Sequence, residues 1–161
     1  MNAEKETFLK NRFLVLLKQI PSDAPPRWGK MSLQQMIEHF SDNFRIASGK
    51  ISYTDIITPE EQLQKMRDFV MSDKPFPENT LNPLMPEVPA PVKNRSVEEA
   101  LKELQTEIRY FFSVFEKNNL QVTRHPVFGD LNFDENLHLL YKHALHHLKQ
   151  FGQTINHESK A

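Results

Sequence analysis

Apolar residues recur every three or four positions in four long stretches of the chain, the pattern of helices that bury one face. The first stretch runs from Glu4 to Gln19 and ends before a group of prolines. The others run from Ser32 to about Ser48, from Ser96 to about Asn118, and from Asn132 to about Asn156. The sequence therefore predicts an all-α fold, a four-helix bundle.

Two of these helices carry start signals. Ser32 followed by Gln35, and Ser96 followed by Glu99, match the capping box, in which the Ser side chain and the later side chain bond each other's backbone N–H groups. Gly49 is placed to end the second helix, because glycine adopts the left-handed conformation common at helix ends.

The connection between the second and third bundle helices is long. Residues 51–58 are short and β-branched, which favours a brief extended piece, and Pro59 opens a short extra helix that reaches about Met71. Residues 73–93 contain six prolines, so we expect no regular structure there. Their apolar side chains predict packing on the bundle, and long ordered loops often act as lids or binding loops.

The composition of the chain restricts the class of protein to which it can belong. The 161 residues contain no repeat and no separating linker, so we expect one domain over residues 1–161. The net charge is −1 with scattered Lys and Arg, which argues against nucleic acid as a partner. Neither a leader nor an apolar run of about 20 residues is visible, so we expect a cytoplasmic protein without a membrane partner. Cysteine is absent, so any metal needs nitrogen or oxygen ligands.

Histidines supply the candidate chemistry, since three of the seven lie in one predicted helix at positions 143, 146 and 147. His143 and His147 are one turn apart at the edge of the apolar stripe, and that spacing allows two imidazoles to reach one ion. His39 borders the apolar stripe of the second helix, so packing of the two helices would bring it to the pair. Three neutral imidazoles plus water or substrate form an open, catalytic type of metal site. Such pairs also arise by chance, which leaves a site without metal as the alternative.

Five further residues are candidates for support of the ligands or for the pocket wall. His146 either orients a ligand or faces solvent, and Gln150 either contacts a bound water or substrate or is solvated. Asn43 either lines the pocket or lies at the surface. His125 precedes a proline and either satisfies its own turn or joins the site. Trp28 is expected to pack, at the pocket mouth.

Three segments together resemble the DinB/YfiT-like superfamily of metalloenzymes, in one of its branches of unknown function. They are WGKMSLQQMIEHF at 28–40, HPVFGDL at 125–131 and LYKHALHHLKQFG at 140–152. Each motif is loose, whereas their order and spacing are fairly specific.

The resemblance implies a four-helix bundle with a divalent metal, usually zinc or nickel. One ligand comes from the second helix and two from a late H-x-x-x-H pattern, roles that fall on His39, His143 and His147. The superfamily often has a second histidine before the last ligand and a glutamine after it, which His146 and Gln150 match. The order after the last histidine is Lys-Gln-Phe-Gly here, where many relatives have Gly-Gln.

Some members of the superfamily are thiol S-transferases that use bacillithiol or mycothiol, and others isomerise a thiol adduct. The expected function is therefore a metal-dependent enzyme that activates a thiol or water, with a small-molecule substrate for which a low-molecular-weight thiol is one candidate. Residues 73–93 have no counterpart in the smaller members, so substrate contacts do not transfer. The alternative is a non-catalytic metal- or ligand-binding bundle. Bundles of this size often pair as two-fold dimers, which makes a homodimer an expectation.

Overall fold

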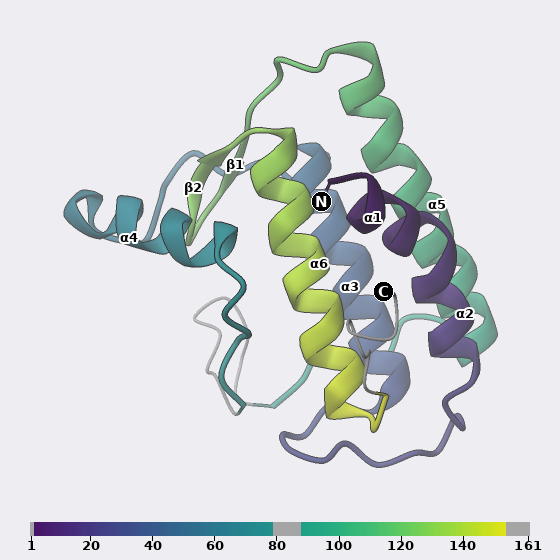
Figure 1. Ribbon diagram of the computed structural model, residues 1–161. Helices are drawn as coiled ribbons and strands as arrows, with labels where there is room; N and C mark the ends of the chain where they lie inside the picture. The colour runs from purple at the N-terminus through teal and green to yellow at the C-terminus, as the bar shows by residue number, and fades with distance from the viewer. Residues whose placement is uncertain (1, 79–87, 154–161) are drawn as a thin grey trace.

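The computed structural model describes residues 2–78 and 88–153, and these are mostly helical with one small two-stranded sheet (Figure 1). The first helical stretch consists of α1 (Asn2–Thr7), the π-helical turn η1 (Phe8–Arg12) and α2 (Phe13–Lys18), which follow one another directly. The predicted helix is thus present, but the apolar spacing gave no sign of the π-helical turn inside it.

Helix α3 (Leu33–Ser48) begins and ends as predicted. The Ser32 hydroxyl accepts a hydrogen bond from the Gln35 N–H, and the Gln35 side chain accepts one from the Ser32 N–H at 2.8 Å. Gly49 ends the helix with φ +84°, a conformation that costs glycine little and other residues more.

Helix α5 (Val97–Lys117) also matches its predicted range, and the Ser96 hydroxyl accepts from the Glu99 N–H. Its capping box is only half formed, because the Glu99 side chain accepts from the Arg95 N–H at 3.3 Å.

Helix α6 (Phe133–Gln150) is shorter than predicted. It starts with a capping box between Asn132 and Glu135. It ends at Gln150, because Gly152 has φ +85° and the Gln153 N–H turns back to the Leu148 carbonyl at 2.8 Å. The extension of the helix to 153 is therefore wrong, and residues 154–156 of the predicted range lie outside the described residues.

The long helices pack side by side around one aromatic-rich core. Helix α3 lies along α5, and α6 contacts α3, α1 and α2 (Figure 1). Each fully buried large side chain contributes about 1.5–3 kcal/mol relative to an exposed one, so the apolar stripes read from the sequence hold the helices together. The largest such side chains include Phe13, Phe40, Phe44, Phe111, Leu104 and Ile108.

The connections contain the main departure from an all-α fold. Strands β1 (Thr123–His125) and β2 (Gly129–Leu131) form an antiparallel hairpin where the sequence predicted only a turn. Three residues are too few to show an alternating pattern. Residues 51–58 form no strand, so the extended piece favoured there is not part of a sheet.

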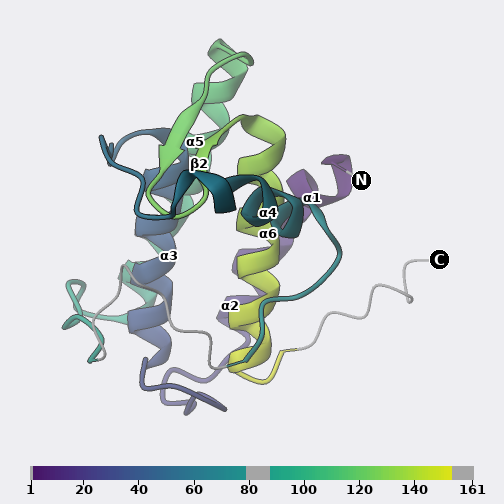
Figure 2. The same cartoon turned by 90° about the vertical axis from the view of Figure 1, so that its left-hand side faces the viewer.

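The predicted extra helix is present as α4 (Glu60–Met71), which packs across α6 next to the hairpin (Figure 2). A second, smaller apolar cluster joins these parts, made of Val70, Val127, Phe128, Leu131 and Leu139. No helix in the described ranges is both long and apolar enough to cross a bilayer.

Candidate metal centre

Helices α3 and α6 bring three histidines together. His39 comes from α3, and His143 and His147 come from successive turns of α6. One ring nitrogen from each lies within 4.8 Å of the other two. Tetrahedral ligands held about 2.0–2.1 Å from an ion are about 3.4 Å apart, so small side-chain rotations suffice to close the cluster on a cation. The three histidines are thus positioned to hold a metal ion.

Burial keeps these imidazoles neutral, the form that binds a metal. Loss of solvation lowers the pKa of His39 to about 4 and that of His147 to about 3, with neighbouring histidines adding to the effect at His147. The pKa of His143 is lowered well below 6.5 by burial and then by His147 and His39. All three therefore offer lone pairs at neutral pH.

The proton of His147 is assigned by its neighbour Gln150. The Gln150 amide nitrogen donates to the Trp28 carbonyl at 2.9 Å, which turns the amide oxygen towards His147. That oxygen lies 2.8 Å from Nδ1 of His147, so Nδ1 carries the hydrogen and Nε2 keeps its lone pair. Gln150 is 3% exposed, so it is not a solvated side chain, and its contact with His147 is the kind of ligand support for which it was a candidate.

Aromatic rings close the α6 side of the cluster. Phe40 lies 5.7 Å from the ring of His147, and Phe76 lies 4.9 Å from that of His143, measured between ring centroids. Phe76 belongs to the proline-rich connection, so part of that segment does cover the cluster. Phe40 belongs to the apolar stripe of α3, whereas Phe76 lies in an irregular segment, where an aromatic residue carries no periodic signal.

His146 and Trp28 pack against each other beside the cluster. Their ring centroids are 5.3 Å apart, and the His146 ring is 5.1 Å from that of His147. His146 also hydrogen-bonds the backbone of Phe76, and burial lowers its pKa. His146 therefore links α6 to the proline-rich connection and does not face bulk solvent.

Of the two remaining candidate residues, Asn43 lies at the site and His125 is engaged in its own turn. The Asn43 amide nitrogen lies 3.3 Å from Nε2 of His39, and Asn43 lines a cavity, as one of its readings expected. Nδ1 of His125 accepts from the N–H groups of Val127 at 3.0 Å and Phe128 at 3.3 Å, so His125 satisfies its own turn.

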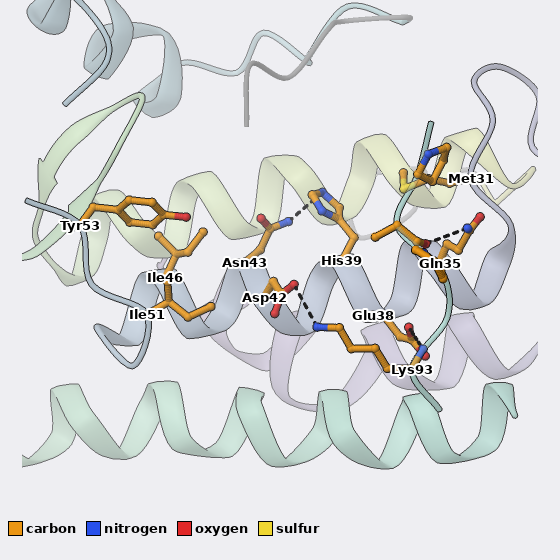
Figure 3. A pocket seen from close by; sticks show the side chains of 13 residues that line it. Met31, Gln35, Glu38, His39, Asp42, Asn43, Ile46, Ile51, Tyr53 and Lys93 are labelled. Atoms are coloured by element: carbon orange, nitrogen blue, oxygen red, sulfur yellow. Dashed lines mark hydrogen bonds and ion pairs between the residues drawn. The ribbon is translucent and has the colours of Figure 1, made fainter. Parts of the chain in front are cut away.

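A cavity of about 240 Å³ opens beside His39 (Figure 3). Its wall is formed by one face of α3, by residues 51 and 53 of the first connection, and by residues 89–91 and 93 at the end of the proline-rich segment. The cavity is large enough for a small molecule and reaches the cluster through His39.

Comparisons of the chain with family models, with curated proteins and with solved structures give no match. The interpretation of the site therefore depends on its own residues. Three neutral imidazoles next to a small-molecule cavity are a donor set suited to one divalent cation with a position left for another ligand.

Proposed function

We propose that the protein is a metal-dependent enzyme in which His39, His143 and His147 hold one divalent cation, zinc or nickel. The observation that supports this most directly is the convergence of three ring nitrogens from two helices within 4.8 Å. When bound, such a cation lowers the pKa of a coordinated water to about 7, and it acidifies a coordinated thiol in the same way.

The chain's own groups prepare that chemistry. Gln150 fixes the hydrogen of His147 on Nδ1, and burial keeps the three rings unprotonated. Phe40 and Phe76 restrict water on the α6 side, and the cavity beside His39 leaves an approach for a substrate. Transfer of a low-molecular-weight thiol to a small electrophile is the reaction we propose first, and hydrolysis is the second.

We also propose that the chain belongs to the DinB/YfiT-like superfamily and forms its four-helix bundle. The support is the order of the elements: the α1–η1–α2 stretch, α3, α5 and α6 pack around one core, with one histidine on the second long helix and two on the last.

A non-catalytic metal site is the competing proposal. It is favoured by the burial of His147 behind Gln150 and by the aromatic cover on His143, which resemble the closed surroundings of a structural ion.

Metal analysis of untagged protein tests the proposal. We expect about one equivalent of zinc or nickel in the wild-type protein and almost none in His143→Ala. His138→Ala is the matched control, because His138 lies on the same helix outside the histidine cluster and its Nδ1 contacts the Asp134 carbonyl at 2.8 Å. A wild-type protein that binds no divalent metal after loading would refute the site. Metal loss that unfolds the protein would favour the structural alternative.

A further inference from the structure

The cavity beside His39 carries the further inference, which rests on the proposed metal site. His39 and Asn43 lie on its α3 wall, while His143 and His147 do not line it. A ligand in this cavity therefore approaches the cluster past His39. The polar groups on the wall decide which ligand chemistry fits.

The two carboxylates of the wall already have partners. Glu38 accepts from the backbone N–H groups of Lys93 at 2.8 Å and Asn94 at 2.9 Å, and from two side-chain amides at 3.0 and 3.2 Å. Asp42 accepts from Arg45 at 2.7 Å and has the Lys93 ammonium at 4.0 Å. The protein itself supplies hydrogen bonds to both carboxylates, so neither needs a cationic ligand to satisfy it.

The Tyr53 hydroxyl, by contrast, has no hydrogen-bond partner among the residues that the structure describes. The backbone on both sides of it is held: the Ile51 N–H donates to the last turn of α3 at 3.1 Å, and Arg124 donates to the Thr54 carbonyl. Figure 3 shows the hydroxyl pointing along the cavity towards Asn43. A phenol fixed in a cavity wall without a partner is a donor available to a ligand.

Asn43 supplies a second donor. Its amide nitrogen lies 3.3 Å from Nε2 of His39, one of the two nitrogens with which this ring can bind a cation. Once a cation takes that lone pair, the amide hydrogen needs another acceptor, and the cavity is where that acceptor would lie.

We propose that this cavity binds a small carboxylate or a carboxylate-like oxyanion, with one oxygen on the cation and the other accepting hydrogen bonds from Tyr53 and Asn43. The Tyr53 hydroxyl and the Asn43 amide nitrogen supply two donors, a cation on the histidines would add positive charge, and a volume of about 240 Å³ limits the ligand to a small molecule. Tyr53 is then a ligand-positioning residue of the site.

Cobalt(II)-substituted protein provides the test, because the visible absorption of Co(II) changes when a ligand enters its open position. Acetohydroxamate is the probe, since it binds a metal through oxygens that keep lone pairs and can still accept hydrogen bonds from the wall. Imidazole is the control ligand, because it has no free acceptor once its nitrogen is on the metal. Tyr53→Phe removes only the hydroxyl, and Tyr110→Phe is the matched control, since Tyr110 lies outside the cavity lining and is 40% exposed.

We expect Tyr53→Phe to bind one equivalent of Co(II) like the wild type and to weaken acetohydroxamate binding about three- to tenfold, the range for one neutral hydrogen bond. Imidazole affinity stays within about twofold, and Tyr110→Phe changes neither. Ala90→Phe, which adds bulk to the cavity lining, should weaken acetohydroxamate binding about tenfold with Co(II) binding intact.

Equal acetohydroxamate affinity in Tyr53→Phe and the wild type, with Co(II) bound in both, would overturn the role of Tyr53 and leave the metal site standing. Unchanged affinity in Ala90→Phe as well would overturn the cavity as the ligand pocket. Failure of the wild type to bind Co(II) would overturn the metal site and this inference with it.

Discussion

Gln150 and His147 are joined by a hydrogen bond of 2.8 Å, with the imidazole Nδ1–H as donor and the amide oxygen as acceptor. The other end of the amide is tied to the Trp28 carbonyl at 2.9 Å, so the chain before α3 takes part in orienting a ring on α6. This contact decides which nitrogen of His147 faces the cluster.

Replacement of Gln150 therefore tests the metal centre without touching a ligand. In Gln150→Met the ring of His147 loses its acceptor, and we expect metal affinity to fall about 10- to 100-fold, the usual effect of removing a group that orients a ligand. Competition with a chromophoric chelator measures it. Gln64→Met is the control, because Gln64 is exposed on α4 and its side chain donates to Asp68 on the same helix. Equal affinities in the two variants would contradict the role of Gln150.

The metal-free protein should lose stability in mild acid. The pKa of His39 is about 4 and that of His147 about 3 when folded, against 6.5 for an unperturbed histidine. Below pH about 6.5 the unfolded chain therefore binds more protons than the folded one, and stability falls as the pH falls, by up to about 1.4 kcal/mol per pH unit for each histidine.

Urea unfolding in a chelator at pH 7.5, 6.5 and 5.5 measures this decline. Carboxylates titrate mainly below this range, so the histidines dominate it. A free energy of unfolding that stays constant over the range would contradict the burial of neutral imidazoles. Bound metal should preserve stability further into acid, since it stabilises the folded state alone.

Lys142 on α6 forms hydrogen bonds with the start of the proline-rich connection. It is 8% exposed, its ammonium donates to the Ser72 and Lys74 carbonyls, and burial lowers its pKa. Lys142→Met leaves both carbonyls without this donor, so we expect the free energy of unfolding to drop by about 1–3 kcal/mol. Faster proteolysis after α4 should accompany the loss.

Lys149→Met is the comparison for that variant, because Lys149 lies on the same helix and makes an exposed ion pair with Glu78. Its loss should cost less than about 0.5 kcal/mol. Similar losses in the free energy of unfolding for the two variants would show that the buried Lys142 ammonium does not hold the proline-rich connection in place.

Removal of the Ser41 hydroxyl should not lower the stability of the protein, in contrast to the loss of the Lys142 ammonium. Ser41 is fully buried on α3, and its hydroxyl has no hydrogen-bond partner within the described ranges. Ser41→Ala should therefore be neutral or stabilise the protein by up to about 1 kcal/mol. Ser48→Ala should destabilise it by about 0.5–1.5 kcal/mol, because the Ser48 hydroxyl donates to the Arg45 carbonyl at 3.1 Å. Thermal melts measure the stability of both variants. A clearly lower melting temperature for Ser41→Ala than for the wild type would contradict the prediction.

The sequence alone determined the helices and the faces they bury. The apolar spacing and the serine cap located α3 and α5 within a residue or two, because helix periodicity and capping are local properties. The same local reasoning located His143 and His147 on one face of α6 and His39 at the edge of another stripe, so the members of the cluster were predictable. The end of α6 was missed, because Gly152 lies among residues that are themselves compatible with a helix.

Only the tertiary structure decided which groups surround those histidines. The contact of Gln150 with Trp28 spans 122 positions, and no periodic pattern encodes a pairing over that distance. The place of Phe76 on His143, the hairpin of β1 and β2, and the phenol of Tyr53 in the cavity wall likewise come from irregular segments. Their positions depend on how the connections pack on the finished helices, because short irregular segments take their conformation from long-range contacts that a single sequence does not display.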